Sequence, residues 1–247
     1  MRADDVAFAE GRGCYTAVRI RGGKPRFAAR HLRRLEAGAD ALGLGRPDPE
    51  RVLRALQELA EAALPGGEGI VRLQLSRDSG GALHLVAVPR GLGEDPPEWS
   101  AIVAPFRHDG GTLLPGGHKL TNRLALALAG DAARRAGAQE ALLFDASGLL
   151  VEGARSNLVV VDAGGRPATP PLSRGGVDGI ARQLARERVP GIAERDVDAA
   201  GLRAAREIVA LNAARGAVPI VSLDGRPVGD GCGGPFARRL AEALDAD

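Results

Sequence analysis

The chain has 247 residues, a formal net charge of +2 from 33 basic and 31 acidic side chains, and a hydrophobic fraction of 45%. This length allows one large domain or two smaller lobes, and the composition excludes a wholly disordered chain. The charges are interspersed and only 3% of the residues are aromatic, which argues against a nucleic-acid-binding protein. Two cysteines and four scattered histidines offer no ligand spacing, so we expect no metal site.

The N-terminal part of the chain predicts a small sheet with two helices. Residues 14–21 alternate with strand period, and Gly22 begins a turn into a second extended run. Apolar spacing predicts a helix over 30–42, while Asp48 followed by Pro49 indicates the start of a second helix that ends near residue 64. Further strands are predicted over 69–77, 83–88 and 100–106.

A glycine-rich segment, 107–117, is typical of a linker. After it we predict helices over 122–135, 176–188 and 235–244, and strands over 140–145, 149–152, 158–161, 207–211 and 218–223. Mixed strands and helices with short hairpins predict an α+β protein with a small N-terminal lobe (1–106) and a larger C-terminal lobe (118–247).

No segment of the sequence suggests a membrane or export signal. The run 124–130 is too short to span a bilayer, and residues 1–5 carry acid where a signal peptide would have a basic and then an apolar region. We therefore expect a cytoplasmic protein.

Four features of the chain suggest cofactor chemistry. Lys119 precedes an apolar helix face, where a desolvated amine could form an imine, although a solvated lysine is the plainer alternative. Glu152 ends an apolar strand and could pair with a cationic ring nitrogen. The segment Gly175–Ile180 opens a helix with free backbone N–H groups, and either Arg33 or Arg34 could bind a phosphate. A phosphate site, a partner for a ring cation and an imine-forming lysine are what pyridoxal 5′-phosphate (PLP) requires.

Seven segments carry motifs in one order along nearly the whole chain. They are 13–19 (GCYTAVR), 31–35 (HLRRL), 119–123 (KLTNR), 141–157 (ALLFDASGLLVEGARSN), 169–172 (TPPL), 176–182 (GVDGIAR) and 212–220 (NAARGAVPI). Together they resemble the fold-type IV, or class IV, aminotransferase family of PLP enzymes. This family includes branched-chain and D-amino-acid aminotransferases and 4-amino-4-deoxychorismate lyase, and the resemblance implies a two-lobed fold and a homodimer.

The resemblance implies a role for each matching residue. Lys119 is implied as the Schiff-base lysine and general base, Glu152 as the acid that pairs with the pyridine nitrogen, and Arg34 as the phosphate-binding arginine. The further positions implied on the phosphate side are Gly179, Ile180, Ala181, Asn212 and Ala213. Ala181 replaces the family's usual threonine, so the resemblance leaves only its backbone N–H for the phosphate. The family's first hairpin strand, ahead of Gly13, is missing or abbreviated.

The substrate is indicated by fewer residues than the cofactor. Candidates for binding it are Tyr15, Thr16, Arg19 and Arg155, although an ordinary surface role is an alternative for each arginine. Most motifs resemble 4-amino-4-deoxychorismate lyase, which releases pyruvate and 4-aminobenzoate in folate biosynthesis. Residues 152–157 resemble the aminotransferases more, so a branched-chain or D-amino-acid aminotransferase remains an alternative. An inactive PLP-fold binding protein is the non-enzymatic alternative.

Overall fold

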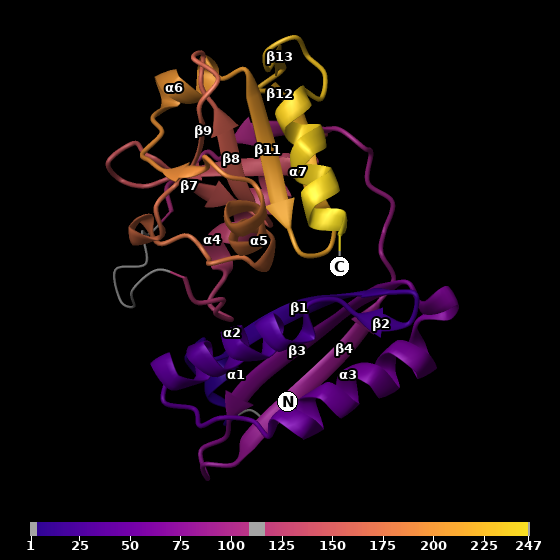
Figure 1. Cartoon of the computed structure of the whole chain (residues 1–247). Helices are drawn as coiled ribbons and strands as arrows, with labels where there is room; N and C mark the ends of the chain where they lie inside the picture. Colours follow the sequence, from indigo (N-terminus) through magenta and orange to yellow (C-terminus); the bar gives the residue numbers. More distant parts are fainter. Residues whose placement is uncertain (1–3, 109–116, 247) are drawn as a thin grey trace. The chain divides into compact units, whose positions relative to one another are not determined.

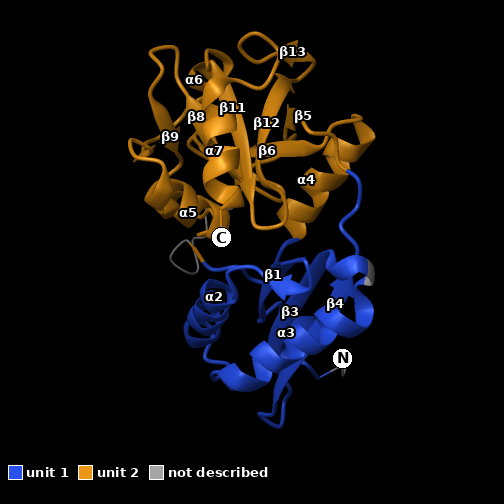
Figure 2. Ribbon diagram, turned by 45° about the vertical axis from the view of Figure 1, so that its right-hand side comes forward, with its two compact units in different colours: residues 1–94, 118–123, 247 blue, residues 95–117, 124–246 orange. Residues whose placement is uncertain are grey.

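The computed structural model describes residues 4–108 and 117–246. These residues form two compact units (Figure 1, Figure 2). Unit 1 contains the chain up to Glu94 together with His118–Arg123, and unit 2 contains Asp95–Gly117 and Leu124–Ala246. Each unit combines helices with a sheet, which confirms the predicted α+β class.

Unit 1 is built on an antiparallel sheet that has, within the described residues, four strands in the order β2-β1-β3-β4. Its elements are α1 (Val6–Ala9), β1 (Cys14–Arg21), β2 (Lys24–Pro25), α2 (Ala28–Ala41), α3 (Pro49–Ala63), the 3-10 turn η1 (Pro65–Gly67), β3 (Gly69–Arg77) and β4 (Leu83–Arg90). The Asp48 side chain accepts hydrogen bonds from the backbone N–H groups of Glu50 and Arg51, which confirms the predicted start of α3.

The two faces of the unit 1 sheet differ because side chains alternate along each strand. One face packs Val18 and Val71 against Val52 and Leu56 of α3. The neighbouring positions of β1 and β3 lie on the other face, where Tyr15 pairs with Gln74 and Ala17 with Arg72. The ring of Tyr15 and the guanidinium of Arg72, which contact each other, therefore lie on this second face.

Unit 2 contains, within the described residues, a nine-stranded mixed sheet in the order β10-β9-β8-β11-β12-β5-β6-β7, with β13 paired to β12. Its strands are β5 (Trp99–Val103), β6 (Glu140–Phe144), β7 (Leu150–Gly153), β8 (Asn157–Val161), β9 (Pro167–Thr169), β10 (Ala193–Glu194), β11 (Glu207–Asn212), β12 (Gly216–Leu223) and β13 (Arg226–Pro227). Its helices are α4 (Leu124–Arg135), the 3-10 turn η2 (Leu172–Arg174), α5 (Ile180–Arg188), α6 (Ala199–Arg203) and α7 (Pro235–Asp245). The core of this sheet is aliphatic around the fully buried Trp99 and Phe144.

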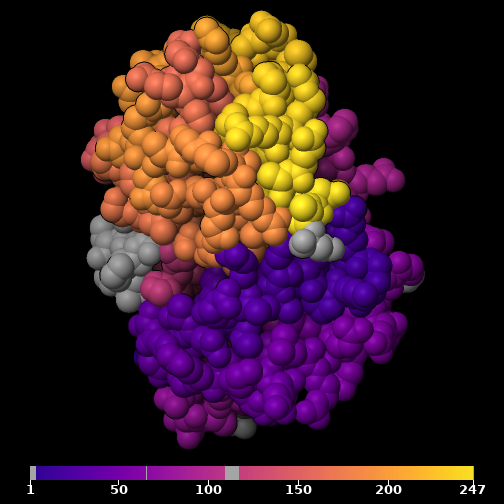
Figure 3. Space-filling view, viewed as in Figure 1, coloured from indigo at the N-terminus to yellow at the C-terminus, as the bar shows by residue number. Residues whose placement is uncertain are grey.

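Helix α7 illustrates how the sequence sets a local element of unit 2. Ala237, Leu240 and Leu244 are buried at helical spacing, and the helix packs against β12. Its first turn is capped from outside, because the Glu207 carboxylate accepts the N–H groups of Phe236 and Ala237 at 3.0 and 2.9 Å. The outer face of α7 is visible in yellow in Figure 3.

The units divide the chain at different places from the predicted lobes. Strand β5 pairs with β12 and β6, so the chain leaves unit 1 at Glu94 and not at residue 106. Residues 118–123 belong to unit 1 because Thr121 N–H donates to the Gly13 carbonyl at 2.8 Å, which ties them to the start of β1. Within the predicted linker 107–117, residues 109–116 lie outside the described residues.

Two predicted helices begin later than expected, because the residues at their predicted starts make other contacts. The helix predicted from residue 122 begins at Leu124, since the preceding residues pair with unit 1. The helix predicted from residue 176 begins at Ile180. There the Val177 N–H donates to Glu152 instead of taking part in a helix.

Candidate functional site

Lys119 is held in unit 1 by backbone pairing with the start of β1. The Tyr15 N–H donates to the Lys119 carbonyl at 2.9 Å, and Leu120 forms an isolated bridge with Cys14. The Thr121 hydroxyl donates to the carbonyls of Gly11 and Gly13 at 2.8 and 3.1 Å. A Cβ on Gly13 would approach Thr121 Oγ1 to 2.9 Å, so the close pairing requires glycine there. Lys119 therefore has a fixed backbone, although it lies in an irregular segment.

The Tyr15 ring is the centre of a cluster of cations in unit 1. The guanidinium carbons of Arg72 and Arg123 lie 4.1 and 5.3 Å from the ring centroid, and Lys119 Nζ lies 4.9 Å from it. Such contacts are favourable because the face of an aromatic ring is electron-rich. The pKa of Arg72 is lowered, chiefly by burial and further by the positive charges of Arg123 and Arg90, while Tyr15 opposes the shift. We call Lys119, Arg72 and Arg123 with Tyr15 the Tyr15 cluster.

The two arginines of the Tyr15 cluster keep hydrogen-bonding capacity. Arg72 donates to the Gln74 side chain at 3.0 Å. Arg123 Nε is buried and has no hydrogen-bond partner among the described residues. Neither guanidinium forms an ion pair with a carboxylate in the described part of the chain. An anionic group would therefore meet donors that no protein carboxylate has neutralised.

Arg34 lies on α2, beside β1 and on its helix-facing side. Its Nη2 donates to the Thr16 hydroxyl at 2.6 Å, and Thr16 Oγ1 is also 2.6 Å from His31 Nδ1. Thr16 and His31 are 0% and 1% exposed. The pKa of His31 lies well below its usual value, because burial and the nearby Arg34 and Lys119 disfavour the charged imidazolium. Thr16, predicted to bind substrate, thus contacts the predicted phosphate-binding arginine.

In unit 2, Glu152 is a buried carboxylate at the end of β7, 4% exposed. Its Oε2 accepts the Val177 N–H at 3.0 Å and lies 3.4 Å from Asn157 Nδ2. His108 Nε2 lies 3.8 Å from the other oxygen, Oε1. The two oxygens are thereby distinguished: one accepts from the chain segment before α5, and the other faces His108.

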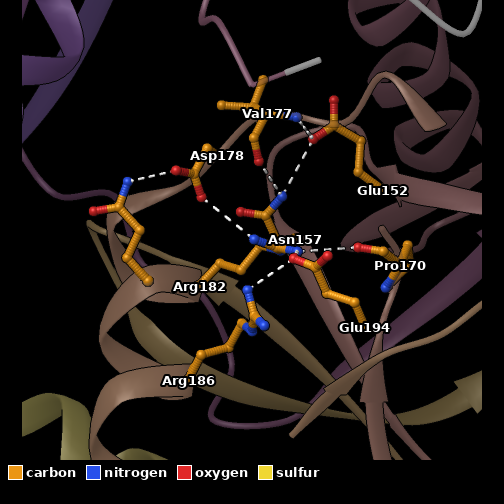
Figure 4. Close-up of polar contacts among 9 residues, drawn as sticks. Glu152, Asn157, Pro170, Val177, Asp178, Arg182, Arg186 and Glu194 are labelled. Carbon is orange, nitrogen blue, oxygen red and sulfur yellow. Dashed lines mark hydrogen bonds and ion pairs between the residues drawn. The ribbon is translucent and has the colours of Figure 1, made fainter. Parts of the chain in front are cut away.

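Asn157 joins Glu152 to the segment that leads into α5. Its Nδ2 donates to the Val177 carbonyl at 2.7 Å and is shared with Glu152, as Figure 4 shows. A Cβ on Gly179 would collide with Asn157 Oδ1, so this junction requires glycine at that position. No side chain of residues 4–108 or 117–246 caps the helix at Gly179, so the helix start is a place where backbone N–H groups can bind an anion.

Arg182 anchors the start of α5 from inside unit 2. Its guanidinium donates to Asp178 at 3.3 Å, to Glu194 at 2.7 Å and to the Pro170 carbonyl at 3.2 Å, and its side chain is 3% exposed (Figure 4). Arg186, one turn later, shares Glu194 at 2.7 Å but is 40% exposed. Asp178, just before the helix, is further held by Gln183 at 2.8 Å.

The remaining predicted residues lie elsewhere in the two units. Asn212 and Ala213 are at the β11–β12 hairpin, where Asn212 Oδ1 accepts the N–H groups of Ala214 and Arg215 at 3.0 and 2.9 Å. Arg19 pairs with Glu68 and donates to the Gly69 carbonyl. Arg155 pairs with Asp95 at 3.2 Å and stacks on Trp99 at 4.3 Å. The structure thus groups Tyr15 with Lys119 and, on the other face of β1, Thr16 with Arg34, and it gives the two other arginines carboxylate partners.

Sequence reasoning missed several members of these networks. Arg72 and Arg123 were not among the predicted site residues, nor were His31, His108 and Asn157. Arg123, His31 and Asn157 lie inside the recognised motifs, which was the available signal. Arg72 carries no such signal, because only the pairing of β1 with β3 brings it to Tyr15.

A lysine within a cation cluster in one unit, and a buried carboxylate linked to an uncapped helix start in the other, are the parts expected of an enzyme that holds an anionic cofactor with a cationic ring. The family model for class IV amino-transferases matches residues 13–223. The chain belongs to this family, and the predicted fold-type IV architecture is confirmed. Enzymes of the family depend on PLP, the cofactor predicted from the sequence.

Individual relatives differ in how much of the chain they match. The bifunctional aminodeoxychorismate lyase / D-amino acid transaminase of Mycobacterium tuberculosis is 28% identical over 100% of this chain and 92% of its own length. The branched-chain-amino-acid aminotransferase of Escherichia coli K12 is 35% identical, but the match covers 50% of this chain and 41% of that enzyme, less than half its length. The solved 4-amino-4-deoxychorismate lyase of Pseudomonas aeruginosa is similar with a TM-score of 0.84 and 28% identity, over 99% of this chain and 94% of that one.

The described residues include neither a metal-binding cluster nor a helix suited to a membrane. No cluster of three or more His, Cys, Asp or Glu side chains suited to a metal ion occurs among them. None of the helices in the described part of the chain is both long and apolar enough to cross a membrane.

Proposed function

We propose that the chain is a PLP-dependent 4-amino-4-deoxychorismate lyase that releases pyruvate and 4-aminobenzoate. The observation that supports this choice within the family is the Tyr15 cluster, in which three cations lie within 5.3 Å of one ring centroid. The proposed substrate carries carboxylates, which need cationic partners, whereas a branched aliphatic side chain would need apolar walls. Relatives named as lyases, matched over nearly the whole chain, support the same choice.

The residues of both units fit the cofactor by their chemistry. Lys119 would hold it covalently, Glu152 would pair with the ring nitrogen, and Arg34 would bind the phosphate. The other phosphate contacts would come from the backbone at Gly179, Ile180 and Ala181, and from the hairpin at Asn212 and Ala213. The collision that a Cβ on Gly179 would cause, and the absence of a capping side chain at α5, suit a backbone anion site.

The cofactor, when bound, supplies a carbonyl that captures the substrate amine and a ring that accepts the electrons released from the substrate. The chain's own residues do the rest. Lys119 Nζ would take the proton that the substrate ring loses, and the C–O bond to the enolpyruvyl group would break with its electron pair leaving on enolpyruvate as the ring turns aromatic. Enolpyruvate then takes up one proton at carbon and becomes pyruvate, so no net proton is lost. Glu152 keeps the ring nitrogen protonated, and Arg72 and Arg123 hold the substrate carboxylates.

A second activity, D-amino-acid transamination, is favoured by one observation. The M. tuberculosis relative that matches the entire chain is named as both a lyase and a D-amino acid transaminase. Both reactions need the same lysine and glutamate, so one site could serve both. A homodimer, a cytoplasmic location and a role in folate biosynthesis stay predictions.

The test is to incubate the purified protein with 4-amino-4-deoxychorismate and, separately, with L- and D-amino acids plus a keto acid. We expect release of 4-aminobenzoate and pyruvate, and loss of both products in Lys119→Ala. Arg72→Met and Arg123→Met should each raise KM for the lyase substrate about tenfold or more, because each removes a charged hydrogen-bond donor. Arg33→Met is the matched control, since Arg33 is exposed on α2.

Different outcomes separate the candidates. Keto acids formed from D- or L-amino acids, without 4-aminobenzoate, would replace the lyase by a transaminase. PLP binding without any product would indicate the non-enzymatic alternative. Unchanged KM in both arginine variants would remove the substrate role of the Tyr15 cluster.

A further inference from the structure

Three polar side chains form a continuous hydrogen-bonded chain inside unit 1. Arg34 Nη2 is 2.6 Å from Thr16 Oγ1, which is 2.6 Å from His31 Nδ1. Thr16 belongs to β1, and both His31 and Arg34 belong to α2, three residues apart on the same helix face. The contact thus joins the strand to the helix that carries the arginine.

The direction of each hydrogen bond follows from the available protons. A guanidinium can only donate, so Thr16 Oγ1 accepts from Arg34. Arg34 Nη2 also lies 3.4 Å from His31 Nδ1, which identifies Nδ1 as an acceptor, so the Thr16 hydroxyl proton is directed to it. His31 therefore carries its own proton on Nε2, a buried nitrogen without a hydrogen-bond partner among the described residues. The neutral state that this arrangement needs agrees with the lowered pKa of His31.

Thr16 is also on the wrong side of the strand for a role beside Tyr15. Adjacent residues of a strand point to opposite faces, so Tyr15 lies among the cations and Thr16 lies against α2. Thr16 is fully buried, and its hydroxyl oxygen is already engaged with two partners. Its surroundings are those of a residue that holds another side chain in place.

We propose that Thr16 and His31 are positioning residues that orient the Arg34 guanidinium toward the phosphate group of PLP, and that Thr16 does not contact substrate. The inference rests on the proposed function, since it takes Arg34 as a phosphate ligand. Holding a long arginine side chain in one rotamer before the ligand arrives lowers the entropic cost of binding. This orientation of Arg34 therefore strengthens the binding of the phosphate group and of no other part of the cofactor.

The experiment compares the affinities of the full-length chain for PLP and for pyridoxal, which lacks the phosphate, by titration of the bound cofactor's absorbance. We expect Thr16→Val to weaken PLP binding about tenfold and to leave pyridoxal binding unchanged, because one charge-assisted hydrogen bond is lost. Thr16→Ser, which keeps the hydroxyl, should restore PLP affinity. His31→Leu should behave as Thr16→Val, and His31→Asn, whose oxygen can replace Nδ1 as acceptor, as Thr16→Ser.

Arg34→Ala separates the inference from the function on which it rests. If Arg34→Ala weakens PLP but not pyridoxal, and Thr16→Val and His31→Leu do not, the positioning role is refuted and the phosphate role of Arg34 stands. If Arg34→Ala has no effect specific to PLP, the proposed phosphate site itself fails. Equal weakening of PLP and pyridoxal in Thr16→Val would indicate general damage to unit 1 and would also overturn the inference. Should Thr16→Val not fold, the two His31 variants make the same comparison.

Discussion

Three cations of unit 1, Lys119, Arg72 and Arg123, lie over the face of Tyr15, whereas the arginines around α5 in unit 2 are paired with carboxylates. A guanidinium stacked on a ring keeps its in-plane N–H groups available for a ligand. One that is paired with Asp178 and Glu194 has its donors occupied and its charge balanced. The positive charge of the Tyr15 cluster is thus suited to recognising an anion, and that of Arg182 and Arg186 to maintaining the fold around the start of α5.

Unit 2 also contains a buried carboxylate that the proposed cofactor site uses. In unit 2, Glu152 is buried, and its Oε2 accepts the Val177 N–H and lies beside the Asn157 amide, both neutral donors. A buried carboxylate stabilised by neutral donors suits the proposed pairing of Glu152 with a cationic ring nitrogen. The predictions below test this division between residues that recognise a ligand and residues that stabilise the fold.

The largest expected effect is on the stability of unit 2. Arg182→Met should lower the free energy of unfolding by about 3 kcal/mol, because it removes the buried cation that Asp178 and Glu194 share and the donor to the Pro170 carbonyl. Arg186→Met, which removes an exposed arm of the same network, should cost less than about 1 kcal/mol. Urea unfolding measures both variants. Arg72→Met provides the contrast in unit 1, with an expected loss of only about 1 kcal/mol from the ring contact. If Arg72→Met lowered the free energy of unfolding as much as Arg182→Met, the proposed difference between the two units would be contradicted.

The second prediction separates two buried glutamates of unit 2. Glu152→Gln should lower kcat about 100-fold, since the amide cannot offer a negative charge to the ring nitrogen, while the Val177 N–H keeps an acceptor. Glu140→Gln should change the melting temperature and leave kcat close to the wild-type value. Glu140 is held by the Ser156 hydroxyl at 2.6 Å and the Ala141 N–H, and burial raises the pKa of its carboxyl. A kcat near the wild-type value in Glu152→Gln would show that the Glu152 charge is not needed for catalysis.

The smallest effect is a pH dependence of stability that arises in unit 1. The pKa of His31 is lowered in the folded protein by burial, Arg34 and Lys119, so below pH 6.5 the unfolded chain binds a proton that the folded chain does not. The free energy of unfolding should therefore fall as the pH decreases from 6.5, by up to about 1.4 kcal/mol per pH unit, and this loss should be absent above it. Urea unfolding of the wild type and His31→Asn at pH 7 and 5.5 isolates the effect, which the variant should lack. Parallel pH profiles for the two proteins would show that His31 titrates normally.

Much of this molecule could be predicted because the signals are local. Asp48–Pro49 marks the start of α3, and the strand period of 14–21 and 69–77 gives β1 and β3. Glu152 was recognised as a strand-end carboxylate within a motif, and it is the buried end of β7. Positions of this kind depend on neighbours a few residues away, which a single sequence displays.

The sequence by itself determined the family and the α+β class, and it predicted Lys119, Glu152 and Arg34 as residues of a PLP site. Tertiary structure alone decided that Lys119 belongs to unit 1, that Arg72 and Arg123 meet on Tyr15, and that Thr16 faces Arg34 and not the ring side of β1. The physical reason is that strand pairing joins residues far apart in the chain, and the pleat then assigns each of them to one face. The alternating pattern of β1 shows that the strand has two faces. Only the contacts of β1 with β3, with α2 and with residues 119–121 show which side chains lie on each face.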